Sequence, residues 1–220
     1  MRKRRIGTAK FFTLLLLLYH TSANVLGITC LVITDLDCSH KNGNNRNESI
    51  QPQRGQGYYS SNPTIENWVI NNKDLDHLLD LSFEEKEEVN PNIPDAKTRV
   101  AYQTPVTVKL SDDIDYEFIP TTFEDSLAYN NFEAFKIMRK TGLIKKFKIA
   151  FCKTDPTIIA KETYEAIKAK GVDKAEFALD LICYKNPGDI VAPNYIDEGL
   201  NWLQEELKSK DSSDFLEEEV

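Results

Sequence analysis

The sequence predicts an α/β fold in which a parallel sheet is flanked by helices. Residues 31–34, LVIT, form a short apolar run without polar alternation, which is typical of a strand covered on both faces. Residues 99–110, RVAYQTPVTVKL, supply β-type residues for one or two further strands. Helical periodicity dominates from residue 121 onwards. We therefore expect residues 30–34 to form a central, largely buried parallel strand.

Helices are expected between about residues 64 and 90 and through the second half of the chain. Thr122 is a candidate N-cap residue with Asp125 three positions later, and Gly142 is a candidate stop. The expected helical stretches are 64–72, 74–89, 121–142, 153–171, 173–186 and 192–210. The apolar face of the last helix is predicted to comprise Ile196, Leu200, Leu203 and Leu207. Loops are expected at residues 40–64 and 111–120.

Composition limits the class of protein. The chain has 220 residues and a formal net charge of −8, which argues against a protein that coats nucleic acid through its overall charge. A nuclease remains possible, because its acidic site must hold metal. The four cysteines lack C-x-x-C spacing and indicate reduced structural thiols.

The amino-terminal segment allows two interpretations. Residues 1–23 combine a basic start, a short apolar run and small residues, as a secretory signal peptide does. The apolar run is too short to span a bilayer. The alternative, which we favour, is a buried helix that leads through Gly27 into the strand. We divide the chain into this segment (1–27), a main domain (28–208) with a helical insertion (about 64–90), and an acidic, frayed tail (209–220).

Two aspartates follow the first predicted strand. Asp35 and Asp37 are expected on one side of an extended chain, since side chains alternate there with period two. Paired carboxylates at the carboxyl end of a parallel strand suit Mg²⁺ or Mn²⁺. A solvated strand end or an Asx turn would give the same sequence pattern.

Six segments, in order, resemble the carboxyl-terminal toprim nuclease portion of OLD-family (overcoming lysogenization defect) ATP-dependent endonucleases. They are LVITDLD, SSNPTIENWV, RVAYQTPV, TTFEDSLAYNN, KAEFALDLI and PNYIDEGLNWLQEEL. The resemblance implies a toprim-like parallel sheet flanked by helices, with a helical insertion and a helical carboxyl terminus. It also implies Mg²⁺- or Mn²⁺-dependent cleavage of DNA.

The resemblance assigns roles to four residues. Asp35 and Asp37 match the D-x-D metal ligands of the family. Glu124 matches an acidic position that serves as a further ligand or positions the metal, and Lys174 matches a lysine that neutralises charge on the phosphate in the transition state. Without the resemblance, Glu124 is a glutamate favoured by the start of a helix, and Lys174 is a solvated lysine.

The sequence also departs from the family pattern. A toprim site uses a glutamate before the D-x-D, but residues 1–34 contain no Asp or Glu, and Cys38 stands where relatives often have serine. No G-x-x-x-x-G-K-[ST] phosphate loop occurs. We therefore expect a fragment in which the first part of the sheet is incomplete, with little or no nicking activity on its own.

Three functional hypotheses follow. The first is a cytoplasmic OLD-like nuclease fragment that acts on DNA and works with an ABC-type ATPase domain or a full-length nuclease; Glu48 or Glu66 would replace the missing glutamate if the chain is active. The second is a noncatalytic interaction module that partners an ATPase or a nuclease. The third is a secreted globular protein with a true signal peptide.

Overall fold

The computed structural model describes residues 27–67, 70–90, 92–93, 96–111, 114–184 and 187–217. The expectations for residues 1–26, a helix or a signal peptide, lie outside this range. The strands are β1 (Cys30–Ile33), β2 (Cys38–Lys41), β3 (Asn47–Ser49), β4 (Tyr59–Ser60), β5 (Glu87–Val89), β6 (Lys97–Ala101), β7 (Val106–Ser111) and β8 (Ile114–Phe118). The helices are α2 (Pro63–Asn67), α3 (Leu75–Asp80), η1 (Glu84–Lys86), α4 (Phe123–Asn130), α5 (Phe132–Ile137), α6 (Gly142–Phe151), α7 (Pro156–Lys168), α8 (Lys174–Ile182), η2 (Pro187–Asp189) and α9 (Asn194–Glu217).

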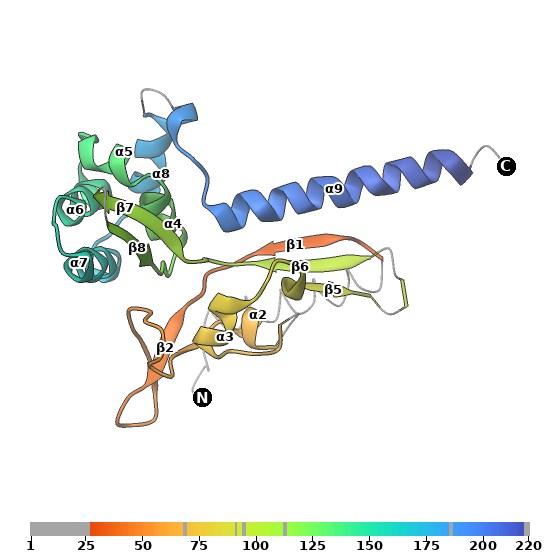
Figure 1. Cartoon of the computed structure of the whole chain (residues 1–220), viewed down its shortest axis with the longest axis horizontal. Helices are drawn as coiled ribbons and strands as arrows, with labels where there is room; N and C mark the ends of the chain where they lie inside the picture. The colour runs from red at the N-terminus through yellow and green to blue at the C-terminus, as the bar shows by residue number, and fades with distance from the viewer. Residues whose placement is uncertain are drawn as a thin grey trace, which may run out of the picture.

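The main sheet has the order β1-β6-β5 (Figure 1). β1 runs parallel to β6, so an α/β fold with a parallel strand pair is confirmed. The central position expected for residues 30–34 is wrong. Within the described residues β1 pairs with β6 alone, so it is an edge strand, and Ile33 is 44% exposed.

β5 corrects a second expectation. Residues 74–89 were expected to be one helix, but helix α3 ends at Asp80, and residues 87–89 pair antiparallel with β6. The charged run there has good helix propensity, yet pairing with the free edge of β6 outweighs that local preference.

Helices cover both faces of the main sheet (Figure 1). On one face, α2 and α3 pack against alternate residues of β6 in a cluster of buried apolar side chains. Its members are Leu36, Cys38, Ile65, Leu75, Leu78, Leu79, Val100 and Tyr102. On the other face lies α9, which approaches most closely at Gly199. A Cβ atom there would lie 3.0 Å from Leu31 Cδ1 and 3.4 Å from Ala101 Cβ, so a side chain at this position would press against the sheet.

The expected face of α9 is wrong. Tyr195, Gly199 and Trp202 face the protein, whereas Leu200 and Leu207 are about half exposed. The helix continues to Glu217, so the frayed tail expected from residue 209 is also wrong in its first part. No helix among the described residues is long and apolar enough to cross a membrane.

Two segments expected to be loops contain strands. Residues 40–64 contribute to a small antiparallel sheet of order β3-β2-β4. Residues 114–118 form β8, which pairs with β7 in a hairpin. In both cases the polar composition reflects strands that are largely exposed: β3 is exposed throughout, and only Phe118 of β8 is buried.

The second half of the chain is a helical layer built on the β7–β8 hairpin. Its core is largely aromatic, with Phe132 and Phe151 stacked at 4.3 Å between ring centroids. The helix expected at 121–142 is divided at Asn131 into α4 and α5. Gly142 begins α6 and does not stop the preceding helix; its φ of +52° lies in the left-handed region that favours glycine. The capping box of Thr122 and Asp125 is confirmed.

Candidate functional site

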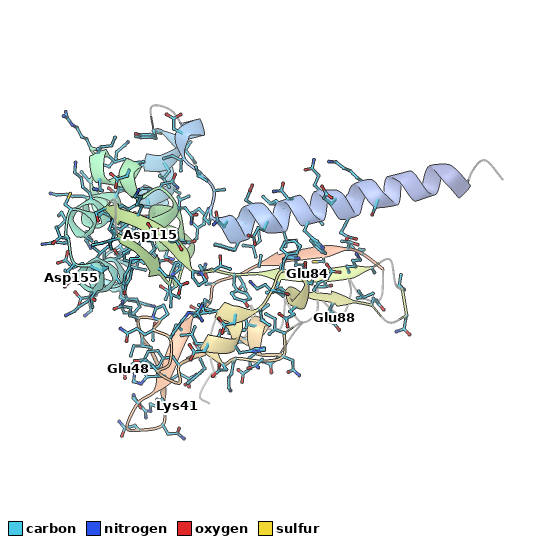
Figure 2. The ribbon with its side chains drawn as sticks, in the orientation of Figure 1. Lys41, Glu48, Glu84, Glu88, Asp115 and Asp155 are labelled. Carbon is cyan, nitrogen blue, oxygen red and sulfur yellow. The ribbon has the colours of Figure 1, made fainter. Side chains whose placement is uncertain are left out.

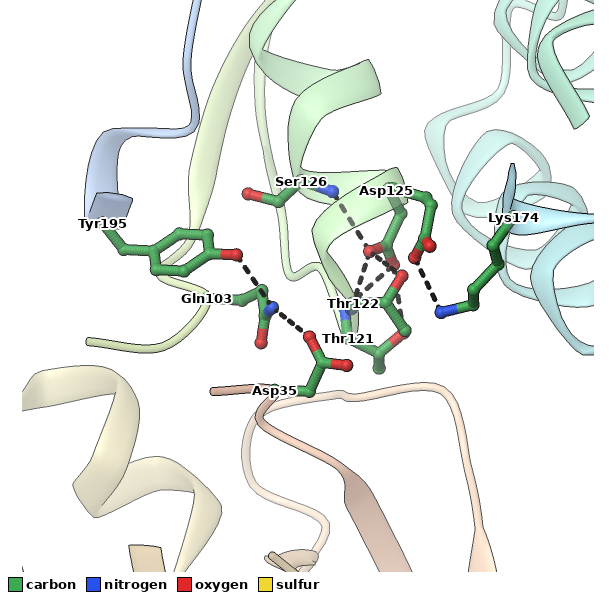
Figure 3. Close-up of polar contacts among 9 residues, drawn as sticks. Asp35, Gln103, Thr121, Thr122, Asp125, Ser126, Lys174 and Tyr195 are labelled. Carbon is green, nitrogen blue, oxygen red and sulfur yellow. Dashed lines mark hydrogen bonds and ion pairs between the residues drawn. The ribbon is translucent and has the colours of Figure 1, made fainter. Parts of the chain in front are cut away.

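The carboxyl ends of β1 and β6 meet at one edge of the sheet, where ligands bind in open α/β folds. Asp35 follows β1 and Gln103 follows β6. The Gln103 amide donates to Asp35 Oδ1 over 2.7 Å (Figure 3). The Gln103 side-chain oxygen accepts the Leu36 N–H over 2.6 Å. Gln103 is fully buried and also donates to the Tyr195 hydroxyl over 3.2 Å. Three separate elements therefore fix the orientation of the Asp35 carboxylate.

The loop after β1 is held in one conformation. Asn62 donates to the carbonyl of Asp35 and to the hydroxyl of Thr34 over 2.6 and 2.7 Å. Asp37 has a φ of +50°, so the extended path expected for residues 35–37 is wrong. The chain turns at Asp37. The two carboxylates nevertheless interact, because the charge of Asp35 raises the pKa of Asp37.

Glu124 and Lys174 reach the same edge from distant parts of the chain. Glu124 lies in the first turn of α4, and Lys174 begins α8. Lys174 Nζ lies 3.0 Å from Glu124 Oε2; the Glu124 side chain is 8% exposed and that of Lys174 is 55% exposed. Both charges act on Asp35, where Lys174 lowers the pKa and Glu124 raises it. The structure thus brings three of the four predicted residues into electrostatic contact, and Asp37 interacts with Asp35 and Lys174.

Burial is the largest influence on both aspartates and raises the pKa of each. Nearby cations offset this effect only in part, so the ionised carboxylates are incompletely neutralised. Oxygen donors with uncompensated negative charge are the ligands that Mg²⁺ and Mn²⁺ prefer. The donors are therefore of the chemical type that binds such an ion. Within the described residues, however, no group of three or more His, Cys, Asp or Glu side chains lies close enough together to hold a metal.

Asp125, next to Glu124, anchors the start of α4. Its buried carboxylate accepts hydrogen bonds from the N–H groups of Thr121, Thr122 and Ser126 and from both threonine hydroxyls (Figure 3). The distances range from 2.8 to 3.1 Å. This network fixes the first turn of the helix and hence the position of Glu124.

Sequence reasoning missed Gln103 and Tyr195 as parts of the site. Tyr195 lies at the start of α9, and burial raises its pKa. Both lie in segments that carry the family resemblance, and Gln103 follows a predicted strand by two residues, which is the only signal that could have identified it.

Cys38 is not a nucleophile in this arrangement. It is buried beside the predicted ligands, and burial raises the pKa of its thiol to about 12. A thiol with this pKa is protonated at neutral pH and unreactive. All four cysteines are free, as expected.

Comparison with known proteins gives one distant relative. The chain is 26% identical over 205 residues to Endonuclease GajA from Bacillus cereus (strain HuB5-5), and the match covers 89% of this chain. The chain is distantly related to an endonuclease. It spans about a quarter (26%) of that relative's length. No family model matches the chain, and no solved structure matches it.

Proposed function

We propose that the chain is a toprim-type nuclease portion of the OLD family that hydrolyses DNA phosphodiester bonds with Mg²⁺ or Mn²⁺. The observation that carries the proposal is the convergence of Asp35, Glu124 and Lys174 at the carboxyl end of β1. These residues are far apart in the sequence, and no local structural requirement brings them together. The similarity to GajA supports the same activity.

Asp35 and Asp37 would hold the metal ion, with Glu124 as a further ligand or as a residue that positions it. The ion would activate water and polarise the scissile phosphate. Gln103 donates to Oδ1 of Asp35. The buried amide thus fixes the carboxylate in one orientation before the ion binds.

Lys174 would act on the phosphate. Its side chain is about half exposed while it pairs with Glu124, so it can reach solvent and substrate. A cation fixed beside the phosphate stabilises the negative charge that develops during hydrolysis. Glu124 would have to exchange Lys174 for metal or substrate before it acts as a ligand. We therefore expect the isolated chain to bind metal weakly and to cleave slowly.

A noncatalytic module that partners an ATPase or a nuclease is the second candidate. The Lys174–Glu124 ion pair favours it, because the pair neutralises the third carboxylate without metal. Under either candidate we expect DNA, an ABC-type ATPase domain or a full-length nuclease as partners, in the cytoplasm.

A plasmid-nicking assay tests the proposal. Supercoiled plasmid is incubated with purified chain and Mg²⁺ or Mn²⁺, and nicked product is quantified. The test variant is Asp35→Ala/Asp37→Ala, and the matched control is Asp115→Ala, which removes an exposed carboxylate on β8 (Figure 2). Loss of a catalytic group typically removes about 10²–10⁴ of the rate.

We expect slow nicking that requires metal, is abolished by EDTA and by the double variant, and is unchanged in the control. Nicking that survives the double variant would refute the site. Metal-dependent nicking lost in Glu48→Ala or Glu66→Ala would show that one of these residues supplies the missing carboxylate; Glu48 lies on the β2–β3 hairpin (Figure 2). No nicking under any condition would favour the noncatalytic module.

A further inference from the structure

A strongly basic segment interrupts this acidic chain. Residues 134–154 contain no Asp or Glu, although the chain as a whole carries a net charge of −8. The seven cations of the segment are Lys136, Arg139, Lys140, Lys145, Lys146, Lys148 and Lys153. The segment covers the end of α5, the following turn and all of α6. Positive charge is therefore concentrated on one part of the molecule.

Most of these cations line one groove. The groove has a volume of about 590 Å³, and no carboxylate is among the residues that line it. We call it the basic groove; it is formed by Met138, Arg139, Lys140, Thr141, Lys145, Lys148, Ile149, Cys152 and Lys153. Its position follows from α6, which buries Leu143, Ile144, Phe147, Ala150 and Phe151 in the aromatic core and so directs its lysines outwards.

The charges in the basic groove are incompletely neutralised. Arg139 and Lys145 are exposed and make no ion pair with a described residue. Lys148 donates to the carbonyl of Met138 over 3.3 Å, and Lys153 lies 3.8 Å from Glu162, at the limit of an ion pair. Only Lys140 has a close carboxylate partner, Asp180 at 3.1 Å. Ordinary solvated lysines would alternate with acidic residues, which this segment lacks.

The basic groove lies next to the candidate active site. The hydroxyl of Thr141 donates to Glu176 over 2.9 Å, and Glu176 lies in the first turn of α8. Lys174 begins that helix two residues earlier, which is about 3 Å along the helix axis. The first turn of α8 therefore contacts the groove through Glu176 and contacts Glu124 through Lys174.

We propose that the basic groove binds the phosphate backbone of DNA and leads it to the site at Asp35 and Lys174. The charge of the groove selects a polyanion, and the choice of DNA rests on the proposed nuclease function. Each strand of a duplex presents one phosphate about every 3.4 Å along the helix axis, so a duplex whose axis runs along α6 places several phosphates against its lysines. Ile149, which is 51% exposed, adds apolar surface for sugars.

DNA binding can be measured without cleavage. The probe is a short fluorescein-labelled duplex, titrated with the full chain in EDTA and followed by anisotropy. The test variant is Arg139→Ala/Lys145→Ala. The control is Arg46→Ala/Lys161→Ala, which makes the same change in charge at exposed positions outside the basic groove.

The salt dependence gives a quantitative expectation. Each lost phosphate contact lowers the slope of log affinity against log salt by about 0.9, so two contacts lower it by about 1.8. Between about 50 and 200 mM salt the wild type should therefore lose about 12-fold more affinity than the test variant. The control should keep the wild-type slope. The proposal would be overturned if all three proteins had the same slope, or if the control variant lowered the slope as much as the test variant.

Two cysteines locate the contact. Cys152 lines the basic groove and is exposed, and Cys183 is exposed outside it. DNA should slow maleimide alkylation of Cys152 and leave Cys183 unchanged, as mass spectrometry of the modified peptides would show. Protection of neither cysteine would place the contact elsewhere and overturn the proposal.

The two proposals fail in different ways. Binding without nicking leaves the groove assignment intact and refutes the nuclease alone, whereas nicking that is unchanged in the groove variant refutes the groove. Binding to anionic phosphatidylserine vesicles but not to the duplex would show that the groove binds a membrane surface and would refute DNA as its ligand.

Discussion

Replacement of Asp125 by alanine tests how the start of α4 is held. The change removes an acceptor that serves five donors, the N–H groups of Thr121, Thr122 and Ser126 and the two threonine hydroxyls. All of these residues are buried, so water cannot easily replace the carboxylate. The first turn of the helix, which carries Glu124, would lose its anchor.

The magnitude follows from the three backbone donors, since the hydroxyls can rotate towards other acceptors. A buried donor left without a partner costs about 1–3 kcal/mol. The start of α4 can shift and let some of these donors find other partners, which lowers the total. We therefore expect a loss of about 3–5 kcal/mol in the free energy of unfolding. By comparison, loss of an exposed N-cap side chain costs about 0.5–2 kcal/mol.

The pH dependence makes the prediction sharper. Burial raises the pKa of Asp125 to about 6, although its hydrogen bonds lower it. Between the ordinary value near 3.9 and this value the folded state binds more protons than the unfolded state, so stability falls as pH rises. The fall amounts to about 3 kcal/mol over that range. The alanine variant has no carboxyl group at this position, so its stability does not show this fall. The difference in free energy of unfolding between wild type and variant should therefore be larger near pH 4 than near pH 7.

Urea unfolding followed by circular dichroism measures both effects. Asp155→Ala is the matched control, because Asp155 caps the exposed start of α7 by accepting from Thr157 and Ile158. The reasoning is refuted if Asp125→Ala costs no more than Asp155→Ala, or if its deficit grows as the pH rises from 4 to 7.

Three further predictions concern the site and the packing of α9. Gln103→Leu should lower stability by about 1–3 kcal/mol, since it leaves buried polar groups unpaired. It should also shift metal binding to higher pH, because the lost hydrogen bond lowers the pKa of Asp35; an unshifted calorimetric pH profile would contradict this. Asp35→Ala should shift residual metal binding by Asp37 to lower pH, because the charge of Asp35 raises its pKa; a shift to higher pH would exclude that coupling. Gly199→Val should lower the free energy of unfolding by about 1–3 kcal/mol through overpacking, whereas Leu200→Ala should change it by no more than about 0.5 kcal/mol. Equal unfolding midpoints for the two variants would show that α9 does not pack on the sheet through the side that carries Gly199.

Features encoded locally were predictable from the sequence. The capping box needs only Thr122 and Asp125 three residues apart, and both side chains make their bonds within one turn. The strand before Asp35 and its parallel pairing follow from an apolar β-branched run. Asp35 lies at a strand end for the same reason. These signals do not depend on what the rest of the chain does.

Features created by distant partners were not predictable. Residues 87–89 become a strand because β6 offers a free edge, and nothing within the segment indicates this. Gln103 becomes part of the site because its amide meets Asp35 and Tyr195, which lie 68 and 92 positions away in the sequence. The Lys174–Glu124 pair was expected only through the family resemblance, since each residue alone is an ordinary helix-start residue.

The misplaced face of α9 has a specific physical cause. Hydrophobic periodicity assumes that a helix buries its leucines, but the sheet face that α9 covers carries Lys97 and Arg99 of β6. Such a face selects polar and aromatic partners. Trp202 lies 5.7 Å from the Arg99 guanidinium and donates to Glu87 over 2.7 Å, and Glu206 pairs with Lys97 at 2.7 Å. Ion pairs and an indole contact thus set the rotation of the helix, and they leave Leu200 and Leu207 on the outer side. In this protein the charges on β6 therefore account for the rotation of α9 better than the apolar spacing of the helix itself.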